Sequence, residues 1–281
     1  MTVASLRTQI EKIGQDGGAE QVGVAFHDYE TQQSWSFQGD LWFHAASTIK
    51  VPVLLGVYGA IHTGLLSEEC RVHVRNRFFS VIDGSRFRVD AGRDANSEVQ
   101  QAIGCTMKVK ELAHHMIATS SNLATNLLID VIGLEEMQRI LEPLHLDGVE
   151  LRRGVEDELA WQAGVNNQVT ANGLLQALRL IVEERVYSPE VCQRMLDVLH
   201  QQRFKDGIPA GLPEGTRVAH KTGDISTAAH DAGIVFLPDR QPYVLAVLTQ
   251  WPPEAGRRGE VIARISQCVF EHLRAAEEEL A

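Results

Sequence analysis

The chain has little cysteine for its 281 residues, and its few thiols are far apart. No Cys-x-x-Cys pair occurs among Cys70, Cys105, Cys192 and Cys268. Isolated cysteines usually behave as small buried apolar side chains. Neither a disulfide framework nor a bound metal is therefore predicted.

Long apolar runs are also absent, and no stretch approaches the eighteen residues that a transmembrane helix needs. The first residues, Met1 to Arg7, lack the features of a signal peptide, so the chain as written is expected in the cytoplasm, or in the periplasm or medium if a leader was removed. A formal net charge of −11 without a basic cluster argues against nucleic-acid and anionic-membrane partners. The expected partner is a small-molecule substrate, and the expected state is a monomer or weak dimer.

Lysine is scarce, with six lysines against twenty arginines, and one lysine follows a serine by three residues. This is Lys50, in the run Ser47-Thr48-Ile49-Lys50, the only Ser-x-x-Lys of the chain. Residues i and i+3 of a helix share a face, so the hydroxyl and the amine can meet there. A serine hydroxyl becomes a good nucleophile when a neighbouring base takes its proton. Alone, the pair is a weak signal. One such match in a chain of this size is near what chance delivers, and a serine at a helix start is often only a helix cap.

Two later motifs add specificity: Ser120-Ser121-Asn122 and Lys221-Thr222-Gly223. Ser-x-x-Lys, Ser-x-Asn and Lys-Thr-Gly in this order are the motif set of class A β-lactamases and penicillin-binding proteins. From about Val22 to the C-terminal helix, the chain resembles the serine β-lactamase-like hydrolases and is most similar to class A. In this family the middle residue of the second motif is usually Asp, and here it is Ser121.

The resemblance implies a catalytic role for Ser47 as nucleophile, for Lys50 as base and for Ser120 as a proton relay to the leaving nitrogen. Asn122 would hydrogen-bond the substrate amide and Lys50. Burial and a second cation, for which Lys221 is the candidate, both favour a neutral amine at Lys50.

The third motif lies on a predicted edge strand along which a substrate can lie. Lys221 and Thr222 would bind a substrate carboxylate. Gly223 has no side chain, so a substrate can approach the backbone of the strand there. By resemblance, the backbone N–H groups of Ser47 and Asp224 would form an oxyanion hole, a device worth about 3–4 kcal/mol per donor in other enzymes. The triplet alone is also compatible with an ordinary strand.

Glu156 is the residue that best discriminates among family members. The run Arg153 to Leu159 resembles the class A loop whose glutamate activates the deacylating water, a general-base role. Family enzymes usually have Asn after the leucine, where this chain has Ala160, and residues 161–168 lack the acid that usually braces the loop against an arginine. Slow deacylation is therefore expected.

Hydrophobic periodicity predicts strands near both ends and helices between them. The expected strands are 21–29, 32–38, 216–222, 230–237 and 242–250, and the expected helices are 3–15, one from about 47, 107–118, 121–132, 134–144, 169–185, 188–201 and 258–279. The fold class is α/β (α+β): a sheet built from both termini and flanked by helices, plus an inserted all-α lobe. The resemblance implies that the sheet is five-stranded and antiparallel, with the active site in the cleft between the lobes.

One β-lactamase-like domain is expected over residues 1–281, with a sheet lobe at about 1–46 and 205–281 and a helical lobe at about 47–204. The expected function is cofactor-free serine hydrolysis of a β-lactam. Two alternatives remain open: a D-Ala-D-Ala-type carboxypeptidase or esterase, and a covalent β-lactam-sensing domain. Roles for four further polar residues near the motifs stay unassigned: His220, His230, Arg257 and Arg258.

Overall fold

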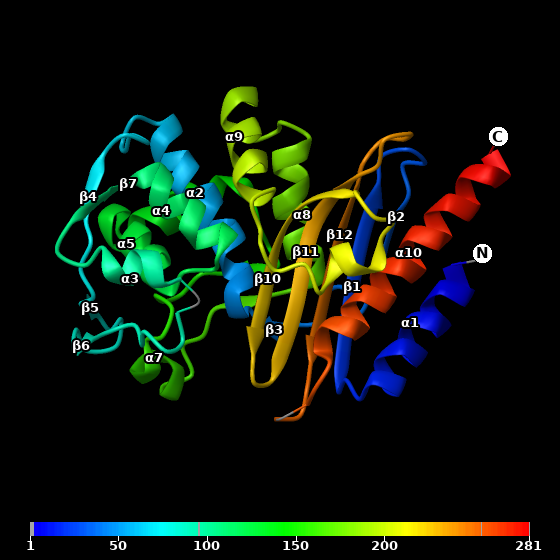
Figure 1. Ribbon diagram of the computed structural model, residues 1–281, viewed down its shortest axis with the longest axis horizontal. Helices are drawn as coiled ribbons and strands as arrows, with labels where there is room; N and C mark the ends of the chain where they lie inside the picture. The colour runs from blue at the N-terminus through cyan, green and yellow to red at the C-terminus, as the bar shows by residue number, and fades with distance from the viewer. Residues whose placement is uncertain (1–2, 95, 254, 281) are drawn as a thin grey trace. The chain divides into compact units, whose positions relative to one another are not determined.

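The structure is a computed structural model that describes residues 3–94, 96–253 and 255–280 (Figure 1). The chain divides into two compact units. The first, here the sheet unit, comprises residues 1–48, 169–179 and 204–281, and the second, here the helical unit, comprises residues 49–168 and 180–203.

A five-stranded antiparallel sheet forms the centre of the sheet unit, in the order β10-β11-β12-β1-β2. Its strands are β1 (Gln21–Asp28), β2 (Ser34–Phe37), β10 (Arg217–Ile225), β11 (Ala228–Phe236) and β12 (Tyr243–Gln250). The predicted α+β class, with a sheet drawn from both ends of the chain, is confirmed. The strand that carries the third motif, β10, lies at the edge of this sheet, as its sequence predicts.

Two terminal helices, α1 (Val3–Gly17) and α10 (Arg258–Leu280), lie side by side along one face of the sheet (Figure 1). Alternate residues of β1 point towards them, and Val22, Val24 and Phe26 are buried in the core that these helices close. This period of two is the pattern expected for a strand with one face against helices. Burial of apolar side chains between the sheet and the helices α1 and α10 therefore stabilises the sheet.

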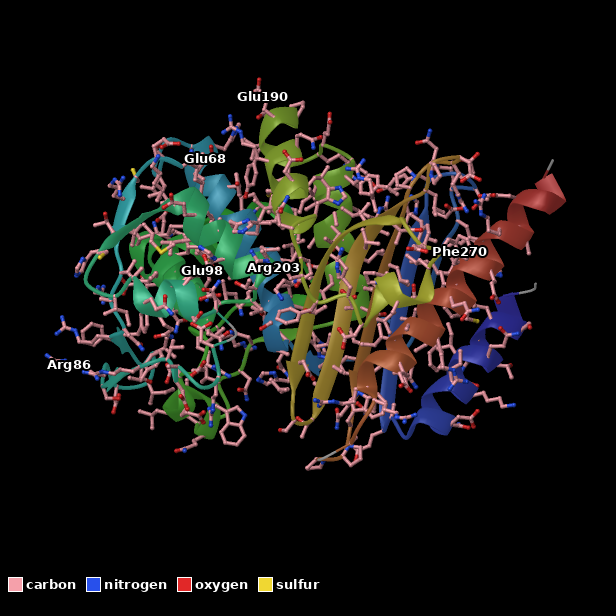
Figure 2. All side chains as sticks on the ribbon, in the orientation of Figure 1. Glu68, Arg86, Glu98, Glu190, Arg203 and Phe270 are labelled. Carbon is pink, nitrogen blue, oxygen red and sulfur yellow. The ribbon has the colours of Figure 1, made fainter. Side chains whose placement is uncertain are left out.

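The helical unit contains α2 (Lys50–His62), and every residue of α2 from Lys50 to Ala60 is buried. Around α2 pack α4 (Val109–Ala118), α5 (Asn122–Ile132), α6 (Leu134–Leu141) and α9 (Pro189–Leu199). Gly59 allows this close packing, because a Cβ there would lie 2.4 Å from the Tyr187 hydroxyl. At the surface, Glu68, labelled in Figure 2, forms an ion pair with Arg194 of α9 at 3.1 Å.

The remaining elements are short strands, single turns and peripheral helices. The helices are α3 (Ser97–Gln101), α4 (Val109–Ala118), α5 (Asn122–Ile132), α6 (Leu134–Leu141), α7 (Glu158–Gln162), α8 (Ala171–Val182) and α9 (Pro189–Leu199). The strands are β3 (Phe43–His44), β4 (Arg71–His73), β5 (Phe78–Phe79), β6 (Arg86–Phe87), β7 (Thr106–Lys108), β8 (Val149–Glu150) and β9 (Gln168–Val169). The described residues also include the 3-10 turns η1 (Ala46–Ile49), η2 (Glu142–Leu144) and η3 (Ile208–Gly211).

Two helix starts near the motifs lie later in the chain than the sequence-based expectation. Ser47 lies in the 3-10 turn η1 and not in the α-helix, which begins at Lys50, and Ala46 at the start of this turn takes a left-handed φ of 45°. Helix α5 (Asn122–Ile132) begins one residue after its predicted start, and Ser121 is its N-cap, since its hydroxyl accepts the Ala124 N–H. Among the described residues no helix is both long and apolar enough to cross a membrane.

Candidate active site

In the sheet unit, Ser47 lies in a tight turn whose backbone is fixed on both sides. His44 Nδ1 accepts the Ala46 N–H at 3.0 Å, and the Thr48 hydroxyl donates to Ala45 O at 2.5 Å. A left-handed φ at a non-glycine residue such as Ala46 is strained and persists only where the surroundings enforce it. The turn therefore holds the backbone of Ser47 in one conformation.

The edge strand β10 lies directly against this turn. A Cβ added at Gly223 would lie 3.1 Å from the backbone N of both Ser47 and Thr48. On the neighbouring strand, His230 pairs in register with Gly223, and its Nε2 lies 2.9 Å from His44 O. Gly223 thus leaves room for this close backbone approach, since a Cβ at that position would make a contact tighter than usual with both backbone nitrogens.

His230 is neutral in this environment. Burial lowers its pKa to about 4, well below the usual 6.5. Its Nδ1 lies 3.1 Å from Thr249 N and 2.8 Å from Ala229 O. A ring with its proton on Nε2 donates to His44 O and accepts the Thr249 N–H, which fits the neutral state. His230 therefore anchors the segment that precedes Ser47 without adding charge.

The other residues of the third motif follow along β10. Lys221 is fully buried, and its Nζ donates to Thr222 O at 2.7 Å. Asp224 is largely exposed and forms an ion pair with Arg258 at 2.7 Å, and Arg258 also bonds Ile225 O. Of the two arginines left open by the sequence, Arg258 lies at this end of β10. Arg257 is 83% exposed and faces Glu260.

In the helical unit, Lys50 is fully buried and surrounded by oxygen acceptors from the second motif. Its Nζ donates to Ser120 O at 2.6 Å, to Ser120 Oγ at 3.0 Å and to Asn122 Oδ1 at 2.8 Å. Ser120 has a left-handed φ of 58°, which turns both its oxygens towards the amine. The predicted meeting of Lys50, Ser120 and Asn122 is thus present.

Desolvation by burial lowers the pKa of Lys50 to about 7. The negative charges of Asp94 and Glu156 raise this pKa, but their effect is smaller than that of desolvation. The amine therefore exchanges its proton near neutral pH. A buried lysine with such a pKa serves both as a proton acceptor and as a donor.

Glu156 belongs to the same cluster. Its Oε1 accepts the Asn122 Nδ2–H at 2.7 Å, and its Oε2 accepts the Asp90 N–H at 2.8 Å. Like Ser120, Glu156 has a left-handed φ, of 61°. Strained backbone of this kind is frequent at functional sites. One side chain, Asn122, thus links the amine of Lys50 to the carboxylate of Glu156.

The loop around Glu156 is braced without the acid that class A enzymes usually use. Arg153 is buried, and its guanidinium donates to Val165 O, to Gly154 O and to the side-chain oxygen of Asn166. Asn126 exchanges two 2.8 Å hydrogen bonds with the backbone of Val155. The hydrogen bonds of the Arg153 guanidinium therefore go to neutral acceptors, while the carboxylates of Asp157 and Glu158 act on it by charge.

Sequence reasoning missed one buried acid close to the second motif. Asp94 is 8% exposed and accepts hydrogen bonds from the Asn122 N–H, the Leu123 N–H and the Ser121 hydroxyl. It lies between the expected helix that begins at about residue 47 and the one at 107–118, where the sequence predicts no element, and no local motif marks it. Nowhere in the described parts of the chain do three His, Cys, Asp or Glu side chains form a group that could hold a metal ion.

Each unit therefore brings together one part of the predicted residues. The sheet unit places Ser47 against Gly223 of the strand that also carries Lys221, Thr222 and Asp224. The helical unit groups Lys50 with Ser120, Asn122 and Glu156.

Comparison with known proteins identifies relatives of one kind. A β-lactamase of Bacteroides uniformis is 28% identical over 182 residues, which span 60% of this chain and 61% of that relative. A β-lactamase of Bacillus licheniformis is 28% identical over 237 residues, which span 81% of this chain and 71% of the relative.

Solved structures and a family model agree with these relatives. The structure of PBP-A has a TM-score of 0.83 at 26% identity, with 97% of both chains covered. A mutant of PBP-A, solved as an acyl-enzyme complex with penicillin G, matches equally well. The model of the beta-lactamase enzyme family matches residues 5–273. By that match the chain belongs to the β-lactamase enzyme family and is a serine hydrolase of this family.

Proposed function

We propose that this serine hydrolase opens β-lactam rings through an acyl-enzyme on Ser47. The observation that carries the proposal is the cluster of Lys50, Ser120, Asn122 and Glu156, in which the pKa of the buried amine lies at about 7. An amine of this kind supplies the base that a serine nucleophile requires. The acyl-enzyme of the PBP-A mutant with penicillin G supports the same chemistry by analogy.

Acylation begins when neutral Lys50 takes the proton of the Ser47 hydroxyl, three residues before it in the chain. The Ser47 oxygen bonds to the lactam carbonyl carbon, and the oxyanion is stabilised by the N–H groups of Ser47 and Asp224. The ring C–N bond then breaks, and the nitrogen receives a proton from Ser120, which Lys50 replenishes. Lys221 and Thr222 attract the substrate carboxylate.

Deacylation requires a water that Glu156 deprotonates. Both Glu156 oxygens already accept one hydrogen bond, from Asn122 and from the Asp90 N–H, so the carboxylate is firmly placed and keeps lone pairs for a water. Position 160 supplies only a buried methyl group. The water therefore has fewer anchors, and release of the acyl group is slow relative to its formation.

The test is intact-mass spectrometry over time with benzylpenicillin, applied to the wild type, Glu156→Gln and Glu158→Gln. Glu158 is a matched control, because it lies in the same loop but is 55% exposed and pairs with Arg93. In Glu156→Gln we expect the Ser47 adduct to form normally and to decay about 10²- to 10⁴-fold more slowly, the usual contribution of a general base. Glu158→Gln should release the acyl group like the wild type.

Two results would contradict the proposal. A wild type that never gains the adduct rules out acylation of Ser47 by β-lactams. Equal decay in wild type and Glu156→Gln removes Glu156 from deacylation.

A second candidate is a D-Ala-D-Ala-type carboxypeptidase or esterase that penicillins merely acylate. Ala160 favours it, since weak deacylation of a penicilloyl group is what such an enzyme displays, and so does the similarity to PBP-A. Turnover of a D-Ala-D-Ala peptide or an ester, with a stable penicillin adduct on Ser47, would decide for it. Prompt turnover of a chromogenic cephalosporin would decide for the β-lactamase.

A further inference from the structure

Asp94 is a buried carboxylate at the start of α5 that collects hydrogen bonds from five donors. Oδ1 accepts the Asn122 N–H at 3.1 Å and the Asn96 N–H at 3.4 Å. Oδ2 accepts the Leu123 N–H at 3.2 Å, the Ser121 hydroxyl at 3.2 Å and the Gln100 side-chain amide at 3.0 Å. The negative charge lies at the positive end of the helix dipole, where it is stabilised.

The donors on α5 belong to the turn that serves Lys50. Asn122 offers its backbone N–H to Asp94 and its side-chain oxygen to the amine. Ser120, immediately before the cap Ser121, holds its left-handed backbone next to this anchor and presents two oxygens to the amine. Movement of Asp94 would therefore displace the oxygen acceptors of Lys50.

A second segment ties Asp94 to the helical unit. Asn96, two residues on, is 3% exposed, and its side-chain amide donates to the Thr119 hydroxyl at 2.5 Å and lies 2.9 Å from His115 Nδ1. The carboxylate is thus fixed independently of α5. This arrangement lets Asp94 hold the turn of Ser120 to Asn122 in one conformation.

Asp94 also acts on the amine by charge. Within the described residues of the helical unit, Asp94 and Glu156 are the two charged groups that raise the proton affinity of Lys50, against its desolvation. Glu156 approaches from the loop before α7, and Asp94 from the segment before α3. The two carboxylates therefore reach the amine from different elements.

We infer that Asp94 is a positioning residue of the acylation machinery, which holds the Ser120–Asn122 turn against Lys50 and sets the charge that the amine experiences. It supplies from another segment the carboxylate that the second motif lacks at Ser121. The inference rests on the proposed acylation of Ser47 only for its kinetic consequence.

The first test measures the titration of Lys50 without substrate. With ¹³C-labelled lysine, the chain has only six lysine signals to assign by NMR. In Asp94→Asn the titration midpoint of Lys50 should move to lower pH, since removal of a nearby negative charge favours the neutral amine. Glu98→Gln, a change of the same charge at an exposed residue of α3 (Figure 2), should leave the midpoint where it is. An unmoved midpoint in Asp94→Asn overturns the inference.

The second test measures Ser47 acylation by benzylpenicillin with intact-mass spectrometry between pH 5 and pH 9. Asp94→Asn should acylate about 10- to 100-fold more slowly at pH 8, the cost of misplaced catalytic groups, and its rising limb should lie at lower pH than that of the wild type. Glu98→Gln should match the wild type. Acylation of Asp94→Asn at the wild-type rate and pH profile overturns the inference, whereas a wild type that gains no adduct overturns the proposed function instead.

A swap variant guards against loss of folding. In Asp94→Ser with Ser121→Asp, the carboxylate returns to the second motif on a residue type that caps helices well. We expect this variant to acylate at least tenfold faster than Asp94→Ser alone, or to fold where Asp94→Ser does not. If the swap variant folds but acylates as slowly as Asp94→Ser, the inference that Asp94 supplies the carboxylate missing at Ser121 is overturned.

Discussion

Replacement of Lys50 by Met should change how the stability of the protein depends on pH. The pKa of Lys50 is about 7 in the folded protein, against the ordinary 10.5 that we take for the unfolded chain. Between these values the unfolded chain binds the proton and the folded protein does not. The wild type therefore gains stability as the pH rises from 7 to about 10.5, and the burial cost is fully present below pH 7.

The magnitude follows from this difference in pKa. Since one pKa unit corresponds to 1.36 kcal/mol, the cost of burying Lys50 is on the order of 4 kcal/mol at pH 7 and under about 1 kcal/mol at pH 10. Lys50→Met removes this cost but leaves Ser120 O and Asn122 Oδ1 without their donor, a penalty of about 1–3 kcal/mol that does not depend on pH. The gap in unfolding free energy between the two proteins should thus shift by about 3 kcal/mol in favour of the wild type between pH 7 and pH 10.

Urea unfolding followed by tryptophan fluorescence at both pH values measures this shift. The double difference cancels every other group that titrates, because both proteins share it. Lys205→Met is the matched control, since Lys205 is exposed, and its gap to the wild type should be the same at both pH values. A Lys50→Met gap that is also the same would refute a lowered pKa at Lys50.

Two further changes test the sheet unit. Gly223→Ala should slow Ser47 acylation by benzylpenicillin about 10²-fold, because its Cβ would press on the backbone N of Ser47 and displace an oxyanion donor; an unchanged acylation rate would show that the turn yields. His230→Gln should remove an acid-sensitive part of stability: the pKa of His230 is about 4 in place of 6.5, so the unfolded chain takes up a proton first as the pH falls and the wild type loses about 2 kcal/mol between pH 7 and pH 4.5. Urea unfolding at those two pH values checks this, and equal losses in both proteins would exclude a neutral ring.

Much of the fold could be predicted because local pattern and tertiary environment agree. In β1 the alternation of Val22, Val24 and Phe26 with smaller residues predicts a strand with one face on helices, and α1 and α10 cover that face. The apolar run after Lys50 predicts a buried helix, and α2 is buried from Lys50 to Ala60. These features depend on neighbours a few residues away, which is the range that periodicity covers.

The details of the candidate site were less accessible, because they depend on contacts between distant segments. The link from Lys50 through Asn122 to Glu156 fits the motif spacing. The second anchor of Glu156 is a backbone N–H, that of Asp90, and any residue type could supply it. Nothing in the sequence around Asp94 marks it as the acid that serves α5, because the three donors from that helix start belong to residues 121–123. Neither a backbone N–H donor nor an acid contributed by a distant segment produces a motif that can be recognised in the sequence.

Two of the departures from the class A pattern, Ser121 and Ala160, therefore have different physical consequences. A carboxylate that acts by charge and by holding a helix start can come from any segment that reaches the same place, since its field extends over several ångströms, and Asp94 meets that requirement where position 121 has a serine. An anchor for the deacylating water must place a polar atom within about 3 Å of it, and the buried methyl group of Ala160 offers none. Acylation should hence tolerate the serine, while deacylation should suffer from the alanine. Restoring the amide with Ala160→Asn should accelerate release of the penicilloyl group and leave its formation unchanged, and intact-mass time courses that show no faster release would place the rate limit elsewhere.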